Sequence, residues 1–309
     1  MVDVKKTKLD WCGNCVMISD DRVELVVSVD FGPRIVQAGI IGRVNFMKQD
    51  IDGVLVSELG DSKFDDNLFR NRGGHRFWIS PEAFPRTYYP DNEPVCFEII
   101  ENGAIFTPAA QVANDLQLKI KITLNELNHE YKIEHYVTNE GYWPKKLAIW
   151  PITVVANRGT ELIPQNTDNT MLLPNRAFAM WPYSKFTDPR LNITDKYIYI
   201  KQDPEVKCSF KIGLYQEHSW GAYFLENDMF VKKYDSQVDA EYPDFGCSYE
   251  SYTNNDILEM ESLSPLYTVE SGETISHTEI WCFYENVNIP ASDSEADELA
   301  EKYNLKEKE

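Results

Sequence analysis

The chain has 309 residues, of which 43% are hydrophobic and 13% aromatic, enough to bury a sizeable core. Its 50 acidic and 30 basic side chains give a formal net charge of -20, which repels nucleic-acid phosphates and anionic lipid surfaces. The composition therefore argues against nucleic acid and membranes as partners, and no run of about 18 apolar residues predicts a membrane span.

Residues 1–15 contain no apolar segment of the kind found in secretory signals, so we expect a cytoplasmic protein. Six cysteines are too few for a disulfide scaffold in a chain of this length, and in the cytoplasm they should stay reduced. Four of them occur among strand-like residues and are expected to be small core hydrophobes: Cys96, Cys208, Cys247 and Cys282.

Short runs of alternating or β-branched apolar residues recur along the chain, and Gly, Asn, Asp or Pro separates most of them. Such runs predict strands. In chain order they are residues 23–29, 35–41, 96–100, 116–124, 131–137, 147–155, 197–200, 208–214, 257–263 and 278–283. The clean alternation in residues 116–122 predicts a strand with one buried and one solvated face, which is typical of antiparallel sheets.

Two segments suggest helix. One is weak and covers residues 58–69. The other is the tail, residues 291–309, where Ser292 or Ser294 can cap acidic first-turn residues and lysines follow. With seven acidic and three lysine side chains, this tail is expected to be a solvated helix. Residues 1–290 contain no repeat or linker, so we expect one β domain followed by an acidic C-terminal helix or tail.

Cys12 and Cys15 form a Cys-x-x-Cys motif, which is reactive when it begins a helix after a strand. Only eleven residues precede Cys12 here, and the chain continues into strand-like sequence. A second Cys-x-x-Cys pair, which a zinc site would use, is absent from the sequence. The pair is therefore expected to be structural rather than a redox centre.

A dense group of chemically useful side chains occupies residues 71–82. Two glycines precede His75, Arg76 and Trp78, and Glu82 follows. Aromatic faces pack on the C–H surfaces of sugars, while Arg, His and Glu bind hydroxyl groups, so the mixture suits a carbohydrate. The alternative is a turn-rich loop whose tryptophan fills the core, and the segment alone does not separate the two.

Polar residues share one face in two late strand-like runs. The period of two places Glu259 and Glu261 on the same face, and paired carboxylates can raise each other's pKa towards that of a useful base. The same pattern also occurs on solvated sheets. His277, Glu279 and Trp281 likewise share a face, and we expect them to have a structural role.

Taken together, these stretches resemble a family of uncharacterised proteins, DUF4380-like, with the galactose mutarotase-like fold and an architecture related to aldose 1-epimerases. The likeness extends from near the start of the chain to about residue 285. It is carried by residues 32–35 with Asn45, by residues 72–78 and 81–82, and by residues 147–150, 181–183, 188–190, 242–244, 258–266, 272–273 and 277–281.

The resemblance implies an all-β protein, a β-supersandwich of two large antiparallel sheets packed face to face, with a ligand cleft on the concave side of one sheet. In mutarotases a late-strand Glu takes the proton of the anomeric hydroxyl, and a His protonates the ring oxygen. Glu259 occupies the place of that Glu, and His75 could be one of the two histidines. The second histidine has no match, because Trp150 stands roughly where it is expected.

The leading hypothesis is an aldose 1-epimerase-like enzyme that acts at the anomeric centre of a small-molecule sugar or sugar derivative, with Glu259 as base and His75 as acid. Arg72 and Arg76 would hold hydroxyl or anionic groups, and Trp78 and Trp150 would form stacking walls. The remaining candidate substrate contacts are Glu82, Asp244 and Glu261. Neither a cofactor nor a metal is expected. A non-catalytic carbohydrate-binding protein or sensor using the same cleft is the alternative, and a glycoside hydrolase or lyase, suggested only by the acidic pair, ranks third.

Overall fold

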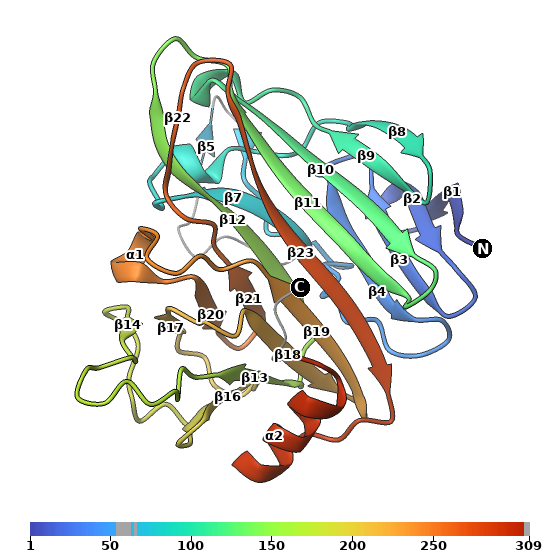
Figure 1. Ribbon diagram of the computed structural model, residues 1–309. Helices are drawn as coiled ribbons and strands as arrows, with labels where there is room; N and C mark the ends of the chain where they lie inside the picture. Colours follow the sequence, from blue (N-terminus) through green and yellow to red (C-terminus); the bar gives the residue numbers. More distant parts are fainter. Residues whose placement is uncertain (54–62, 65–66, 306–309) are drawn as a thin grey trace.

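The computed structural model describes residues 1–53, 63–64 and 67–305 of the chain. In these ranges nearly all regular structure is β, arranged as two large antiparallel sheets (Figure 1). The expected all-β, two-sheet architecture with a short C-terminal helix is thus confirmed. Among the described residues, no helix has the length and apolar character needed to cross a membrane.

The first sheet contains eleven strands among the described residues. In spatial order they are β1 (Asp3–Leu9), β2 (Gly13–Ser19), β3 (Val23–Ser28), β4 (Arg34–Ile40), β7 (Gly74–Ser80), β12 (Lys145–Val155), β21 (Leu258–Ser262), β20 (Tyr249–Thr253), β17 (Phe210–Leu214) and β14 (Phe178–Met180), with β22 (Tyr267–Val269) paired to β12. β7, β12 and β21 lie at its centre and carry most of the residues predicted to form a site.

The second sheet contains ten strands in the same described ranges. Their order is β15 (Leu191–Ile193), β16 (Tyr197–Lys201), β13 (Thr160–Pro164), β18 (Trp220–Leu225), β19 (Asp228–Tyr234), β23 (Thr274–Glu285), β11 (Glu130–Asn139), β10 (Leu116–Asn125), β9 (Gly103–Thr107) and β8 (Cys96–Ile100). Each of the ten runs predicted as strands coincides with a strand of one of the two sheets.

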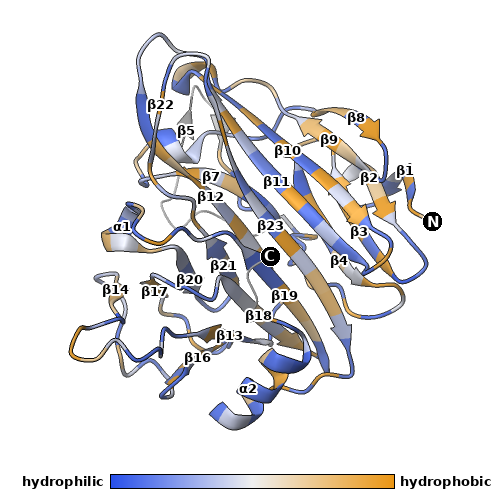
Figure 2. Ribbon diagram, in the orientation of Figure 1, coloured by the Kyte–Doolittle hydropathy of each residue, from blue (hydrophilic) through white to orange (hydrophobic). Residues whose placement is uncertain are grey.

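The core lies between the sheets, and period-two alternation determines which side chains enter it. In β10 every second residue from Leu116 to Leu124 is buried, while the residues between them are partly exposed. Figure 2 shows the matching alternation of hydrophobic and hydrophilic residues along β10 and β11. Apolar side chains of both sheets join in one cluster, which includes Ile35 and Ile149 from the first sheet and Ile122 and Ile133 from the second.

Two expectations about local structure need correction. The weak helix over residues 58–69 falls partly outside the described residues, and within it Lys63–Phe64 (β5) pairs with Asn67–Leu68 (β6) as two short strands. Of the four cysteines expected in the core, Cys247 and Cys282 are buried, but Cys96 and Cys208 are exposed. Cys96 begins β8, the edge strand of the second sheet, which pairs with β9 on one side only among the described strands.

The tail forms α2 (Asp293–Lys302), and the Ser292 side chain accepts a hydrogen bond from the Glu295 backbone N–H. The sequence suggested a helix solvated on all sides, but one face of this helix is buried. Ala296, Leu299 and Ala300 are buried against a cluster of aromatic and aliphatic residues that includes Trp220. A one-turn helix, α1 (Pro243–Gly246), and two 3₁₀ turns, Arg86–Tyr88 and Val112–Asn114, complete the regular structure of the described chain.

Candidate functional site

Strand β7 sends alternate side chains to opposite faces of the first sheet. Phe77 and Ile79 belong to the apolar core between the sheets, whereas Arg76 and Trp78 line a cavity on the other face. On the neighbouring strand β12, Trp150 lies directly opposite Trp78. The two tryptophan rings pack edge to face with their centroids 5.6 Å apart.

This cavity, which we call the aromatic cleft, has a volume of about 240 Å³. It crosses strands β7, β12, β21, β20 and β17 of the first sheet. Its lining combines aromatic rings with a few charged and amide groups: Phe69, Asn71, Arg76, Trp78, Glu82, Tyr88, Trp150, Trp181, Tyr183, Lys211, Tyr252, Asn254, Ile257 and Glu259. A small polar molecule with apolar faces matches such a lining.

A buried ion cluster supports one wall of the cleft. The Trp150 indole N–H donates a 2.7 Å hydrogen bond to Glu261, and the Lys211 ammonium lies 2.9 Å from the same carboxylate oxygen. Lys211 also lies 2.7 Å from Glu250, and its ammonium sits over the rings of Trp150 and Trp181. Although burial opposes its charge, the two carboxylates raise the pKa of Lys211 well above its usual value. Lys211 is therefore a fixed cation.

The opposite part of the cleft holds the pair of Arg76 and Glu259. Their closest atoms, Arg76 Nη2 and Glu259 Oε1, are 3.4 Å apart, and the guanidinium stacks 4.4 Å from the centre of the Trp78 ring. Burial raises the pKa of Glu259, and the positive charge of Arg76 partly opposes that rise. Glu259 is thus a cleft carboxyl that holds its proton more tightly than an exposed one.

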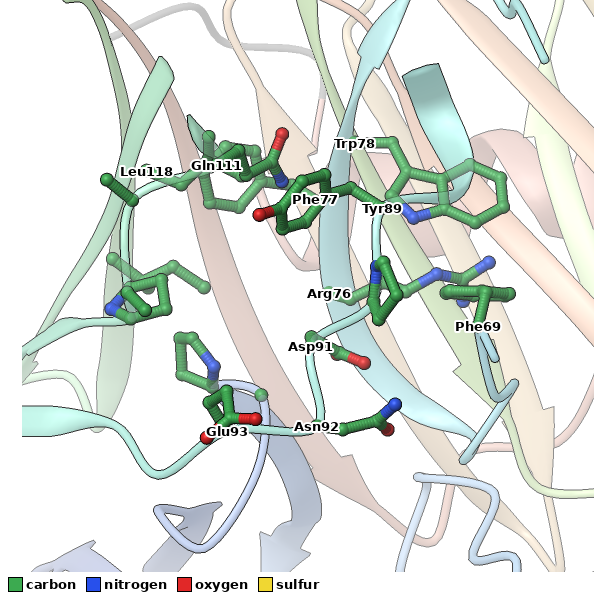
Figure 3. Close-up of a pocket in the computed structure, with 17 residues that line it drawn as sticks. Phe69, Arg76, Phe77, Trp78, Tyr89, Asp91, Asn92, Glu93, Gln111 and Leu118 are labelled. Carbon is green, nitrogen blue, oxygen red and sulfur yellow. The ribbon is translucent and has the colours of Figure 1, made fainter. Parts of the chain in front are cut away.

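A second cavity, the side cavity, adjoins the cleft and has a volume of about 180 Å³ (Figure 3). Three residues line both spaces and so form the wall between them: Phe69, Arg76 and Trp78. Figure 3 shows these three on one side of the side cavity and Gln111 and Leu118 on the other. Arg76 therefore borders both spaces.

His75 does not belong to the site. It is fully buried between the sheets, on the face of β7 opposite Arg76 and Trp78. The predicted acid therefore does not line the aromatic cleft, and its buried position gives no support to the role expected from the sequence. The physical reason is the strand period of two, which sends neighbouring residues to opposite faces.

His75 instead belongs to a directed chain of hydrogen bonds that joins the sheets. The His135 Nδ1–H donates to the His277 carbonyl at 3.1 Å, which leaves Nε2 of His135 to accept from His75 Nε2–H at 2.8 Å. His75 Nδ1 then accepts from the Thr153 hydroxyl at 2.9 Å, and that oxygen accepts from Lys232 at 3.1 Å. Burial lowers the pKa of His75 well below its usual value and that of His135 to about 4, so both rings are neutral.

Lys232 connects this chain to a second buried group. Its ammonium donates to the Met260 carbonyl at 2.9 Å and lies 2.8 Å from Glu279 Oε1. Glu279 also accepts from Ser262 at 2.6 Å and from the Trp281 indole at 2.9 Å. Because every polar atom in the set has a partner, we assign it the structural role expected for Glu279 and Trp281.

Donor atoms of His75, His135 and Glu279 lie within 4.8 Å of one another, close enough to hold a metal ion. The hydrogen bonds already use the ring lone pairs, and the Lys232 ammonium occupies the position beside the carboxylate. A divalent cation would have to displace that ammonium. The set therefore fits a lysine better than a metal.

The structure brings five of the nine predicted site residues to the aromatic cleft: Arg76, Trp78, Glu82, Trp150 and Glu259. Glu261 lies beneath the cleft wall, fully buried by Trp150 and Lys211. Arg72 lines neither cavity; it donates to Asn92 and stacks on Phe31.

Asp244 also lies outside both cavities, in the short helix α1, where its backbone has a positive φ of 51°. Its expected contact with substrate therefore has no support from its position. Sequence reasoning missed Lys211, Tyr88 and Tyr252, which line the cleft. A signal for Lys211 was present, since it is a single cation in an otherwise apolar strand.

Cys12 and Cys15 are both buried, with their sulfur atoms 3.5 Å apart. They pack in a small cluster with Phe31, Val36 and neighbouring apolar side chains. This environment supports the expected structural role.

No family model matches the sequence, and no curated protein matches it either. Membership of the DUF4380-like family therefore stays a prediction. Solved structures do match over most of the chain. A proposed aldose 1-epimerase from Klebsiella pneumoniae superposes with a TM-score of 0.59 at 10% identity, covering 100% of this chain and 88% of that one.

A proposed mutarotase from Salmonella typhimurium gives a TM-score of 0.57 at 10% identity, with 91% of this chain and 94% of that one covered. A galactose mutarotase-like protein from Clostridium acetobutylicum gives 0.54 at 12% identity, with 92% and 99% covered. At such identities the likeness shows the fold alone. The chain has the galactose mutarotase-like fold.

Proposed function

We propose that the protein binds a sugar or a sugar derivative in the aromatic cleft. The observation that carries the proposal is the placement of Trp78 and Trp150 beside the Arg76–Glu259 pair on one face of the first sheet. Indole faces cover the C–H surfaces of a sugar ring, while the charged pair supplies a donor and an acceptor for its hydroxyl groups. The shared fold with mutarotase-like proteins supports the same class of ligand.

Binding is tested by titrating the protein with a panel of hexoses, pentoses, uronates and sugar phosphates, followed by calorimetry and ligand-observed NMR. Trp78→Ala should lower the affinity for any ligand that binds about tenfold, because it removes one stacking surface. Trp143→Ala is the matched control, since Trp143 is 80% exposed and lines neither cavity. Equal affinities in the two variants, or no saturable binding across the panel, would contradict the proposal.

Chemistry at the anomeric centre is the second candidate, and the observation that favours it is Glu259. A buried cleft carboxyl with a raised pKa is suited to take a proton from an anomeric hydroxyl. A general acid to protonate the ring oxygen has less support, because no histidine of the described chain lines the cleft. Lys211 and Tyr88 both have raised pKa values there, so they release a proton poorly. We therefore rank carbohydrate binding ahead of epimerisation.

NMR exchange spectroscopy of anomers tests this candidate on the ligands that bind. If the protein is an epimerase, Glu259→Gln should slow exchange about 100-fold or more while binding persists. Unchanged exchange in Glu259→Gln, or no acceleration by the wild-type protein, would leave binding as the function.

A glycoside hydrolase or lyase using Glu259 and Glu261 is not favoured. Glu261 is fully buried and already accepts from Trp150 and Lys211, so it cannot act on a bond in the cleft. A cytoplasmic location remains part of the proposal, and cell fractionation would test it.

A further inference from the structure

Arg76 has N–H donors that no described residue pairs with. The side chain is only 4% exposed, yet its Nε and Nη1 atoms have no hydrogen-bond partner among the described residues. Its single polar contact with the described part of the chain is the 3.4 Å approach of Nη2 to Glu259, which is long for a charge-assisted hydrogen bond. Buried donors without partners destabilise the protein, so a ligand that pairs with them gains affinity.

Two of the carboxylates that act on Arg76, Asp91 and Glu261, already pair with other cations. Asp91 pairs with Arg34 at 2.8 Å, and Lys211 has its own carboxylates in Glu250 and Glu261. Burial is the main cause of the lowered pKa of Arg76; the carboxylates of Glu259, Asp91 and Glu261 oppose the shift, and the positive charge of Arg34 adds to it. An acceptor that reaches Nε and Nη1 would therefore pair with donors that no described residue uses.

The location of Arg76 gives such an acceptor access. The residue lines both the aromatic cleft and the side cavity, so it lies beside space that a ligand can occupy. A sugar ring packed on Trp78 or Trp150 would bring its substituents next to it. The guanidinium also stacks on Trp78, which fixes its plane.

We propose that the natural ligand is an acidic sugar of the hexuronic acid class, whose carboxylate pairs with Arg76. The proposal rests on the proposed carbohydrate-binding function and deepens it. A planar carboxylate matches the planar fork of a guanidinium. A phosphate ester, with nearly two negative charges, fits less well, because Glu259 lines the cleft and Asp91 and Glu93 line the side cavity.

The experiment compares four ligands of one stereochemistry by calorimetry at neutral pH: galactose, galacturonate, the methyl ester of galacturonic acid, and galactose 6-phosphate. The same set is repeated in the gluco series. In one series, the uronate should bind at least about tenfold more tightly than its parent hexose, and the uncharged ester should lose that advantage. The ester arm needs no variant, so it is informative even if substitutions at Arg76 disturb folding.

Two variants then locate the effect. In Arg76→Gln the uronate-to-hexose affinity ratio should fall to about one, and in Arg76→Lys, which keeps the charge but not the fork, it should fall to an intermediate value. Arg158→Gln is the matched control, because Arg158 is exposed and lines neither cavity. Its ratio should stay at the wild-type value.

The possible results test the acidic-sugar inference separately from carbohydrate binding. If hexoses bind and uronates bind no more tightly, or if Arg76→Gln keeps the preference, the acidic-sugar inference is overturned while carbohydrate binding stands. Tighter binding of the phosphate than of the uronate would also overturn it in favour of a sugar phosphate. If no member of either series binds, both the inference and the proposed function fail.

Discussion

The indole N–H of Trp150 and the carboxylate of Glu261 form a 2.7 Å hydrogen bond that joins a wall of the aromatic cleft to the ion cluster beneath it. Glu261 has no exposed surface, so its influence on a ligand is indirect. It holds the ring plane of Trp150 and the position of Lys211 at once. Glu261 is thus a positioning residue for the cleft.

Removing that carboxylate should destabilise the protein. Glu261→Ala leaves the Trp150 N–H without its acceptor and Lys211 with only Glu250, so we expect a loss of about 3–5 kcal/mol in the free energy of unfolding. Urea denaturation measures it. The control is Glu241→Ala, which breaks an exposed pair with Lys146 and should cost less than about 1 kcal/mol. Similar losses in both variants would mean that the buried cluster contributes no more stability than an exposed ion pair.

The buried histidines should make the protein sensitive to mild acid. Burial lowers the pKa of His277 to about 3. Between pH 6.5 and 4.5 the unfolded chain therefore takes up a proton at this position and the folded chain does not. Stability is lost as the pH falls, by about 1.4 kcal/mol per pH unit for each such histidine.

His277→Gln isolates this contribution, since an amide can still donate to Ser262, which His277 contacts at 2.9 Å. The stability difference between wild type and variant should shrink or reverse as the pH falls from 6.5 to 4.5, measured by urea denaturation at each pH. A difference that stays constant across that range would show that His277 protonates equally in both states.

Glu161 should give the stability of the protein the opposite dependence on pH. Burial raises its pKa to about 8, partly opposed by hydrogen bonds from Ser251 and Tyr249. From about pH 4.5 to 8 the folded state holds a proton that the unfolded state releases, so stability falls as the pH rises. Glu161→Gln removes the titration, and its stability relative to wild type should increase between pH 5 and pH 8. Thermal unfolding at those two pH values measures the change, and no change would refute the raised pKa.

The sequence left Ser292 and Ser294 as alternative caps for the C-terminal helix, and the structure selects Ser292. Ser292→Ala should therefore cost about 1 kcal/mol in unfolding free energy, whereas Ser294→Ala should change it by less than about 0.5 kcal/mol. Denaturant titration of the two variants checks this, and the reverse order would place the cap at Ser294.

Period-two patterns predicted ten of the strands, though not β7, because one buried face per strand is a local property of the sequence, as in residues 116–124. The same rule could have separated His75 from Arg76, which are neighbours in one strand. The sequence could not tell which of them faced the cleft, since large side chains occur on both faces of β7. That choice depends on Lys232 and His135, which come from the other sheet.

Long-range partners also explain why Lys211 was missed. A lysine within an apolar strand is stable there because Glu250 comes from the neighbouring strand β20 and Glu261 from β21, the next strand beyond it. The tail was misjudged for a related reason. Its charges suggested full solvation, but Leu299 and the two small alanines form a narrow apolar stripe that fits against Trp220.

The two-sided character of β7 has a consequence for how the protein can change over time. Positions 76 and 78 contact the cleft, while positions 75 and 77 anchor one sheet to the other. Exchanges at the first pair alter the surface of the cleft, and exchanges at the second pair alter the contacts between the sheets. The lining of the cleft can therefore change among descendants of this chain while the contacts that join the two sheets are kept.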